Sequence, residues 1–165
     1  MKKLNLVWLG LGTNLGDRRR NLVTAAGLIY LKVGPLHEVS GIYKTAAWGV
    51  TEQPDFLNQA VCARTVLNPA AVLREINEIE NFMGRVRDQK WGPRLIDIDI
   101  LYFENEIIDE TNLKIPHPRI QERNFVLIPL SEIAPDFVHP VFNLSNRELL
   151  HRSKDTAEVT PFLSE

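Results

Sequence analysis

The sequence predicts an α+β fold, in which a mostly antiparallel sheet is flanked by helices. The first observation is the order of its periodic segments: strand, helix, two strands, helix, strand. That order is typical of a ferredoxin-like βαββαβ core. The second is a length of 165 residues with an ordinary composition, 44% apolar and 24% charged, which predicts one domain over 1–165. An added hairpin and C-terminal helices complete the α/β/α sandwich that we expect.

The first strand and helix lie on either side of a glycine-rich turn. An apolar run over 6–11 predicts a buried strand, and apolar residues at helical spacing predict a helix over 18–32. Two nucleotide-binding motifs fail on spacing. A P-loop would end in Gly-Lys-Ser/Thr, and a dinucleotide fingerprint would need glycine where Leu15 stands. We interpret the glycines as a tight strand-to-helix turn and leave a functional role for Gly12 or Asn14 open.

The middle of the chain predicts two further strands and a second helix. Segments 39–44 and 55–66 have strand-like composition, and the connection between them is long enough to favour a functional loop. Asn68, followed by a proline, predicts the start of a helix that Gly84 ends.

The last third predicts a hairpin, a short helix and a tail. Residues 103–106 are typical of a hairpin turn into a strand at 107–108. A capping box from Ser145 to Glu148 predicts the last helix. The polar segment 152–165 predicts a frayed tail.

Charge and cysteine content exclude several classes of protein. A net charge of −2 gives no overall basis for binding nucleic acid. The single Cys62 excludes an internal disulfide and a cysteine-based zinc cluster, which fits a reducing compartment. No apolar stretch approaches the length that spans a membrane. We therefore expect a cytoplasmic monomer that binds neither nucleic acid nor membrane.

The segment 85–101 carries the strongest chemical signal, and its second half indicates a metal site. The residues alternate, so that Asp97 and Asp99 share one face of a strand and Ile98 and Ile100 share the other. Aspartate is depleted in strands, and two like charges so close together repel, so the pair indicates a bound cation. Two carboxylates can hold one or two Mg²⁺ ions. The alternative is a pair of solvent-facing charges on an edge strand.

A basic loop forms the first half of this segment. Its charged residues are Arg85, Arg87, Lys90 and Arg94. Arginine side chains bind phosphate bidentately and stabilise the charge that develops during its transfer. Trp91 is suited to exclude water if the loop closes. We interpret this half of the segment as a lid that clamps phosphate.

Together these motifs resemble the 6-hydroxymethyl-7,8-dihydropterin pyrophosphokinase family. The resemblance rests on Arg-Val-Arg at 85–87, Trp-Gly-Pro-Arg at 91–94 and Asp-Ile-Asp at 97–99. It extends through other segments over most of the chain up to about Pro135. The Trp-Gly-Pro-Arg and Asp-x-Asp combination is specific, whereas the glycine turn by itself is not.

The resemblance implies a reaction and its cofactors. The β,γ-diphosphate of ATP, the co-substrate, would be transferred to the hydroxymethyl group of 6-hydroxymethyl-7,8-dihydropterin, with release of AMP, in folate synthesis. Asp97 and Asp99 would hold two Mg²⁺ ions. Arg85 and Arg94 would assist the transfer, and Trp91 would close over the site.

The resemblance also assigns residues to the two substrates. An amide that bonds the ring edge and phenyl rings that stack on it belong to the expected pterin pocket, whose residues are Thr45, Ala46, Trp48, Phe56, Asn58 and Phe125. The expected ATP side is formed by Leu73, Asn77, Glu80, Arg87, Ile100, His117, Arg119 and Arg123. The sequence departs from the family's usual pattern at several points. Thr13 stands in place of serine, Ala46-Ala47 where proline is frequent, and Phe56 in place of a frequent tyrosine. Only three residues separate Arg87 from Trp91.

Two other functions remain open from the residues themselves. A two-metal phosphohydrolase could use the same aspartates but would gain nothing from an aromatic pocket. A non-catalytic nucleotide-binding module would have no turnover to lose. Formation of AMP from Mg-ATP only when the pterin is present would separate transfer from both.

Overall fold

The computed structural model describes residues 2–47, 52–84 and 95–164. A six-stranded antiparallel sheet forms its centre, in the order β5-β1-β4-β3-β8, with β2 also paired to β4. These strands are β1 Asn5–Thr13, β2 Leu36–Val39, β3 Tyr43–Thr45, β4 Phe56–Thr65, β5 Asp97–Phe103 and β8 Val159–Pro161. The helices are α1 Arg18–Lys32, α2 Pro69–Phe82, α3 Asn124–Ile133 and α4 Asn146–Arg152, with a 3₁₀ turn at Ile120–Glu122.

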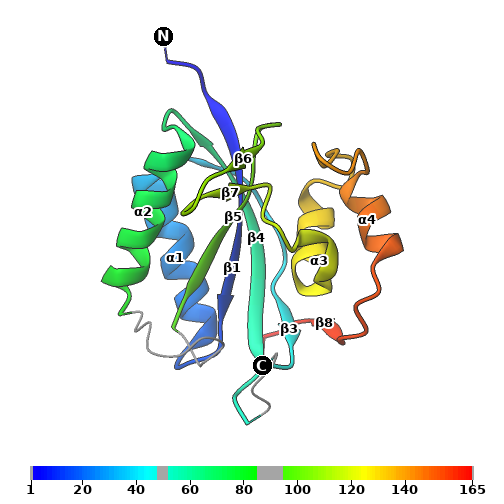
Figure 1. Cartoon of the computed structure of the whole chain (residues 1–165). Coiled ribbons are helices and arrows are strands. Elements are labelled where there is room, and N and C mark those ends of the chain that lie inside the picture. The colour runs from blue at the N-terminus through cyan, green and yellow to red at the C-terminus, as the bar shows by residue number, and fades with distance from the viewer. Residues whose placement is uncertain (1, 48–51, 85–94, 165) are drawn as a thin grey trace.

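The helices cover the two faces of the sheet, as Figure 1 shows: α1 and α2 on one side and α3 and α4 on the other. Alternation along β1 separates two cores. Leu9 and Leu11 belong to the cluster that includes residues of α1 and α2, whereas Trp8 belongs to the cluster that includes residues of α3 and α4. The predicted α+β fold with a ferredoxin-like core and helices on both faces is confirmed.

Three helices begin where the capping residues in the sequence predict that they begin. Asp17 caps α1 by accepting a hydrogen bond from the Arg20 N–H at 3.0 Å. Asn68 caps α2 in the same way at the Ala71 N–H, 2.9 Å away. The capping box at the start of α4 is formed as predicted. These interactions join residues three positions apart, so the sequence encodes them directly.

Two predicted strand elements differ in the structure. The strand expected over 39–44 is split into β2 and β3, because the Ser40 hydroxyl accepts from the Ala60 N–H at 2.9 Å and interrupts the ladder. The turn over 103–106 forms, but the strand after it does not return along β5. Instead β6, Ile108–Asp109, pairs with β7, Lys114–Ile115, so the added hairpin lies one segment later than predicted.

The tail also differs from the prediction. We expected 152–165 to fray, but β8 lies within this segment and pairs with β3. The reason is long-range pairing, which polarity of the local sequence does not reveal. Across the described ranges 2–47, 52–84 and 95–164, no helix combines the length and apolar character needed to cross a membrane.

Candidate active site

A row of residues across three adjacent strands forms the floor of the site. Gly12 on β1 is paired with Asn58 on β4 and with Asp97 on β5. Gly10 is paired with Asp99 two residues further along the same strands. Directly paired residues of antiparallel strands share one face of the sheet. The amide and the two carboxylates therefore face the same side, separated only by glycines that have no side chain.

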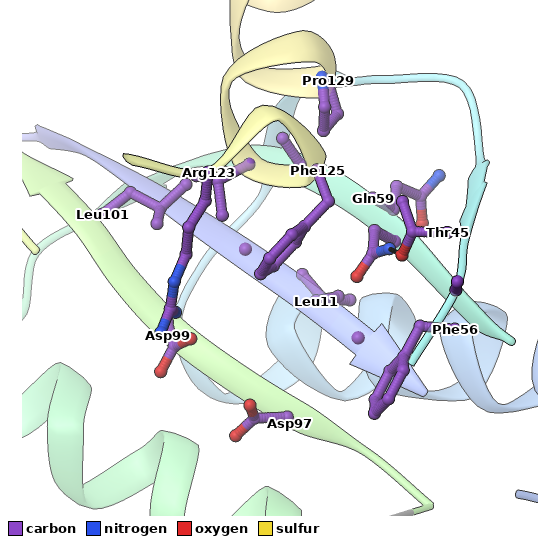
Figure 2. A pocket seen from close by; sticks show the side chains of 16 residues that line it. Leu11, Thr45, Phe56, Gln59, Asp97, Asp99, Leu101, Arg123, Phe125 and Pro129 are labelled. Atoms are coloured by element: carbon purple, nitrogen blue, oxygen red, sulfur yellow. Dashed lines mark hydrogen bonds between the residues drawn. The ribbon is translucent and has the colours of Figure 1, made fainter. Parts of the chain in front are cut away.

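A cavity opens above this floor, under α3. Figure 2 shows Phe125 reaching from α3 toward β1, with Phe56 beside Thr45 at the far end. The lining combines apolar walls with a few polar groups, which is typical of a small-molecule site. Its residues are Gly10, Leu11, Gly12, Thr45, Ala46, Phe56, Asn58, Gln59, Ala60, Asp97, Asp99, Leu101, Arg123, Phe125, Val126 and Pro129.

The polar end of the cavity is an Asn–Thr pair. The Asn58 side-chain amide donates a hydrogen bond to the Thr45 hydroxyl at 2.9 Å, and both residues are buried. One of the two N–H groups of the amide is engaged there, and the carbonyl oxygen of Asn58 is positioned to accept from a ligand N–H. This oxygen lies on the Gly12 side, where an added Cβ would approach it to 3.3 Å.

The acidic end of the cavity is formed by Asp97 and Asp99. Both are half-buried, and Figure 2 shows Arg123 extending from the α3 side toward Asp99. The Arg123 guanidinium also lies 5.6 Å from the centroid of the Phe125 ring. Burial lowers the pKa of Arg123, and the charge of Asp99 opposes that shift. One arginine thus connects the aromatic wall to the carboxylate pair.

The donor set of this end fits Mg²⁺. Within the described ranges, no three His, Cys, Asp or Glu residues gather into a group that could enclose a metal ion. Two carboxylates on one strand face are instead the sparse set that Mg²⁺ uses when water and substrate phosphate supply its other ligands. Asp97 and Asp99 are the residues that would hold it.

Strand β5 lies at the sheet edge, and Glu80 of α2 accepts a hydrogen bond from it. The Glu80 carboxylate accepts from the Ile98 backbone N–H at 2.9 Å and is 2% exposed. Ile98 lies between the two aspartates, so this bond fixes the segment that presents them. The sequence places Glu80 near a site but does not reveal this contact. The available signal is an acid near a helix C-terminus, where the macrodipole disfavours it.

A second cavity lies beyond Asp99, which lines both cavities. Its residues are Leu73, Ile98, Asp99, Ile100, Thr111, Asn112, Leu113, Lys114, His117 and Pro118. The Nδ1 atom of His117 accepts from the Arg119 N–H at 3.1 Å. Burial and the charge of Arg123 lower the pKa of His117 to about 4. The ring is therefore neutral at neutral pH, with its remaining proton on Nε2, where it can donate to an anion.

The structure brings together most of the residues singled out from the sequence. The first cavity holds Thr45, Ala46, Phe56, Asn58, Asp97, Asp99, Arg123 and Phe125. The second holds Leu73, Ile100 and His117. Asn77, Glu80 and Arg119 line neither cavity. Trp48, Arg85, Arg87, Trp91 and Arg94 lie outside the described residues.

The glycine segment is the main feature that sequence reasoning misjudged. Gly10 and Gly12 belong to strand β1 and not to the turn, and they keep the cavity floor open. Their spacing of two residues, typical of one strand face, is the signal that could have identified them. Asn14 has a structural role here: it is buried, and its amide donates to Gln53 Oε1 at 3.0 Å and to the Pro54 carbonyl at 3.1 Å. It thereby holds the loop that leads into β4.

Comparison with known proteins decides the family. A family model described as 7,8-dihydro-6-hydroxymethylpterin-pyrophosphokinase (HPPK) matches residues 8–135. The chain belongs to this family. It is 39% identical over 158 residues to the 2-amino-4-hydroxy-6-hydroxymethyldihydropteridine pyrophosphokinase of Aquifex aeolicus, with 94% of each protein covered. The Bacillus subtilis enzyme of the same name is 45% identical over 131 residues, covering 79% of this chain and 78% of that protein.

Solved structures agree with this pyrophosphokinase fold. A Plasmodium falciparum HPPK-DHPS triple mutant crystallised with pteroate has a TM-score of 0.75 and 20% identity, over 91% of this chain. The match spans 43% of that longer protein. At this identity the likeness shows the fold alone. With the family established, the chain is an enzyme that transfers diphosphate from ATP to hydroxymethyldihydropterin in folate biosynthesis.

Proposed function

We propose that this transfer takes place across Asp97 and Asp99, with the pterin in the first cavity and ATP in the second. The observation that carries the proposal is the strand register, in which Gly12 lies between Asn58 and Asp97. An acceptor bound at the amide would lie directly beside the carboxylate pair. Asp99 lines both cavities, so a diphosphate held there would be in reach of both substrates.

The first cavity suits a planar, hydrogen-bonding ring. Phe125 and Phe56 supply aromatic surface for stacking. The Asn58 carbonyl oxygen is positioned to accept an N–H of the ring edge, and its bond to Thr45 fixes the orientation of the amide. Ala46 lines the same cavity, and Trp48 completes the proposed pterin set. These contacts would hold the hydroxymethyl group toward the acidic end and reduce the entropy cost of reaction.

The proposed metal set is Asp97 and Asp99 with two Mg²⁺ ions. When bound, the ions would neutralise the negative charge of the transferring diphosphate. The protein's part is to hold the carboxylates in place, through β5 and the Glu80–Ile98 bond. The charge of Asp99 acts on Arg123, so this arginine would add positive charge at the same point.

The proposed ATP side uses the second cavity and the residues around it. Leu73 and Ile100 offer apolar contact for an adenine ring, and the Nε2–H of His117 can donate to a phosphate oxygen. Asn77, Glu80, Arg87, Arg119 and Arg123 complete the proposed set. For the chemical step we propose Arg85 and Arg94, with Trp91 excluding water so that ATP is not hydrolysed.

We also propose that the enzyme acts as a cytoplasmic monomer on small molecules, without nucleic acid or membrane. The single cysteine and the net charge of −2 support this. Analytical ultracentrifugation would give about the mass of one chain, 18.8 kDa. A dimer mass at micromolar concentration would contradict the monomer.

The test of the site is substrate-dependent AMP formation in Asn58→Ala. Loss of the amide removes the ring-edge acceptor, and we expect pterin affinity to fall about 10- to 100-fold, as for one or two lost hydrogen bonds. ATP affinity should change little, because two sites that are not coupled do not share binding energy. The matched control is Asn105→Ala, at an exposed turn position.

Three outcomes decide the proposal. AMP that forms only with the pterin, with affinity lost only in Asn58→Ala, supports transfer at this cavity. Equal loss of ATP and pterin affinity would move Asn58 out of the acceptor site. Phosphate release from ATP without pterin would point to hydrolysis instead.

A further inference from the structure

Helix α3 begins without a cap of its own. Its N-cap residue is Arg123, which makes no side-chain capping bond, and arginine is not among the residues that favour this position. Yet this end of the helix matters, because Arg123 and Phe125 line the first cavity. The orientation of the aromatic wall therefore depends on how the first turn of α3 is held.

The missing cap comes from Asp155, which lies 31 positions after Asn124 in the chain. The Asp155 carboxylate accepts from the Asn124 backbone N–H at 2.8 Å, through Oδ2. The Asn124 side chain donates in turn to the Asp155 backbone carbonyl at 3.0 Å. A carboxylate at this point satisfies one of the exposed N–H groups of the helix and complements the positive end of its dipole.

Asp155 is itself fixed in place by its neighbours. Its second oxygen, Oδ1, accepts from the Ala157 N–H at 2.9 Å. Its own N–H donates to the Ser153 hydroxyl at 3.2 Å. Both carboxylate oxygens are thus committed to backbone N–H groups, so the side chain holds one geometry and can transmit it to α3.

The same segment continues to the opposite wall of the cavity. Strand β8 pairs with β3, and Val159 is the direct partner of Thr45. The Phe162 N–H donates to the Ile42 carbonyl at 2.8 Å, and its ring packs against the main core. We call residues 153–162 the C-terminal strap. It bonds to the α3 wall at one end and to the β3 wall at the other, and it lies beyond the family match at 8–135.

We propose that Asp155 is a positioning residue for the acceptor cavity, and that the C-terminal strap sets the spacing between the wall that carries Phe125 and the wall that carries Thr45. The inference rests on the proposed placement of the pterin in this cavity. The bonds of the strap described above go to α3 and to β3, whereas the second cavity is lined by α2, β5 and the segment 111–118. Loss of the Asp155 bond should therefore act on the pterin far more than on ATP.

The experiment compares four variants of the full chain: Asp155→Ala, Asp155→Asn, Phe125→Ala and Asp136→Ala. Asp136 is the matched control, an exposed carboxylate just beyond the other end of α3 that pairs with Arg147. Pterin and ATP affinities are measured by titration calorimetry, and thermal unfolding is measured in parallel. The Asn124 amide resonance in a ¹H–¹⁵N spectrum reports directly on the bond.

We expect Asp155→Ala to weaken pterin binding about tenfold, equivalent to about 1.4 kcal/mol, and ATP binding much less. Asp155→Asn keeps an acceptor oxygen and should recover a large part of the loss. The Asn124 amide resonance should move upfield in Asp155→Ala and partly return in Asp155→Asn. Asp136→Ala should bind pterin as the unmodified chain does. If Asp155→Ala does not fold, Asp155→Glu takes its place, since its longer side chain moves the carboxylate off the Asn124 N–H.

The outcomes separate this inference from the assignment of the site. Weaker pterin binding in Phe125→Ala with no change in Asp155→Ala overturns the positioning role and leaves the cavity in place. Unchanged pterin binding in Phe125→Ala overturns the cavity as the acceptor site, and the inference with it. Equal losses in Asp155→Ala and Asp136→Ala, or equal losses of pterin and ATP, would mean general destabilisation and would also overturn it.

Discussion

The Glu80 carboxylate accepts a hydrogen bond from the backbone N–H of Ile98 at 2.9 Å, between the two aspartates of the proposed metal site. Strand β5 is an edge strand, and an edge presents N–H groups that its sheet does not pair. Here a buried side chain from α2 accepts a hydrogen bond from one of these N–H groups. Helix α2 is thereby linked to the position of Asp97 and Asp99, although neither aspartate needs to contact the helix.

Replacing Glu80 by alanine should therefore damage both stability and metal binding. The Ile98 N–H would be left buried without this partner, which costs about 1–3 kcal/mol in the free energy of unfolding. Urea denaturation measures that loss, and titration with Mg-ATP measures the effect on β5. Glu80→Gln keeps an acceptor oxygen and should lose less.

The matched control for Glu80 is Glu78→Ala, on the same helix but with a largely exposed side chain that pairs with Lys32. Exposed pairs contribute about 0–1 kcal/mol, so this change should be nearly silent. If Glu78→Ala and Glu80→Ala were equally destabilised, the Ile98 bond would not be the cause.

A methyl group at Gly12 should impair the acceptor cavity and leave the fold intact. The Cβ of Gly12→Ala would lie 3.3 Å from Asn58 Oδ1 and 3.8 Å from Phe56 Cδ1, at the proposed ring edge. We expect pterin affinity to fall about tenfold or more, because the extra atom occupies space that a ligand needs. Isothermal titration with pterin and with ATP separates the two sites.

Gly27→Ala is the control for this substitution. Gly27 lies in α1, and a Cβ there would meet nothing within 4 Å. Alanine inside a helix is favoured over glycine by about 0.5–1 kcal/mol, so this variant should be slightly more stable and bind pterin normally. Normal pterin binding by Gly12→Ala would contradict the assignment of the cavity floor.

Stability should fall in mild acid because of a buried histidine away from the site. His139 is 3% exposed, and its Nδ1 accepts from the N–H groups of Val141 and Phe142 at 3.1 and 3.2 Å. Burial lowers the pKa of His139 to about 4 in the folded state, from an ordinary 6.5. Between these values the unfolded chain binds more protons than the folded chain, so stability is lost as the pH falls from 6.5 toward 4.

The variant His139→Asn isolates this contribution. Its side-chain oxygen can accept from the same N–H groups, but it does not titrate. Between pH 7 and pH 4.5 the unmodified chain should lose on the order of 2 kcal/mol more than the variant, as followed by urea denaturation. Parallel pH profiles for the two proteins would show that His139 does not titrate in this way.

Local structure was largely predictable from the sequence. Caps at Asp17, Asn68 and Ser145 join residues within one turn, and periodicity within each segment identifies its buried face. The same alternation correctly placed Asp97 and Asp99 on one face, because a strand has a fixed period of two.

Long-range pairing was not predictable in the same way. The Leu6 N–H donates to the Glu104 carboxylate across 98 positions, and the C-terminal strap reaches α3 and β3 through bonds that local composition does not signal. Gly12 was misjudged for the same reason, since its place between Asn58 and Asp97 follows from register and not from its neighbours in sequence.

In the proposed mechanism, Asp97 and Asp99 together support diphosphate transfer next to the pterin cavity. The most direct test is the single-turnover rate of AMP formation by Asp97→Asn and Asp99→Asn with Mg-ATP and saturating pterin. Removing one carboxylate charge while keeping its shape should slow the step by at least about a hundredfold, with pterin affinity and unfolding nearly unchanged. Asp136→Asn serves as the control at an exposed carboxylate. Near-normal rates in either site variant would contradict the assignment.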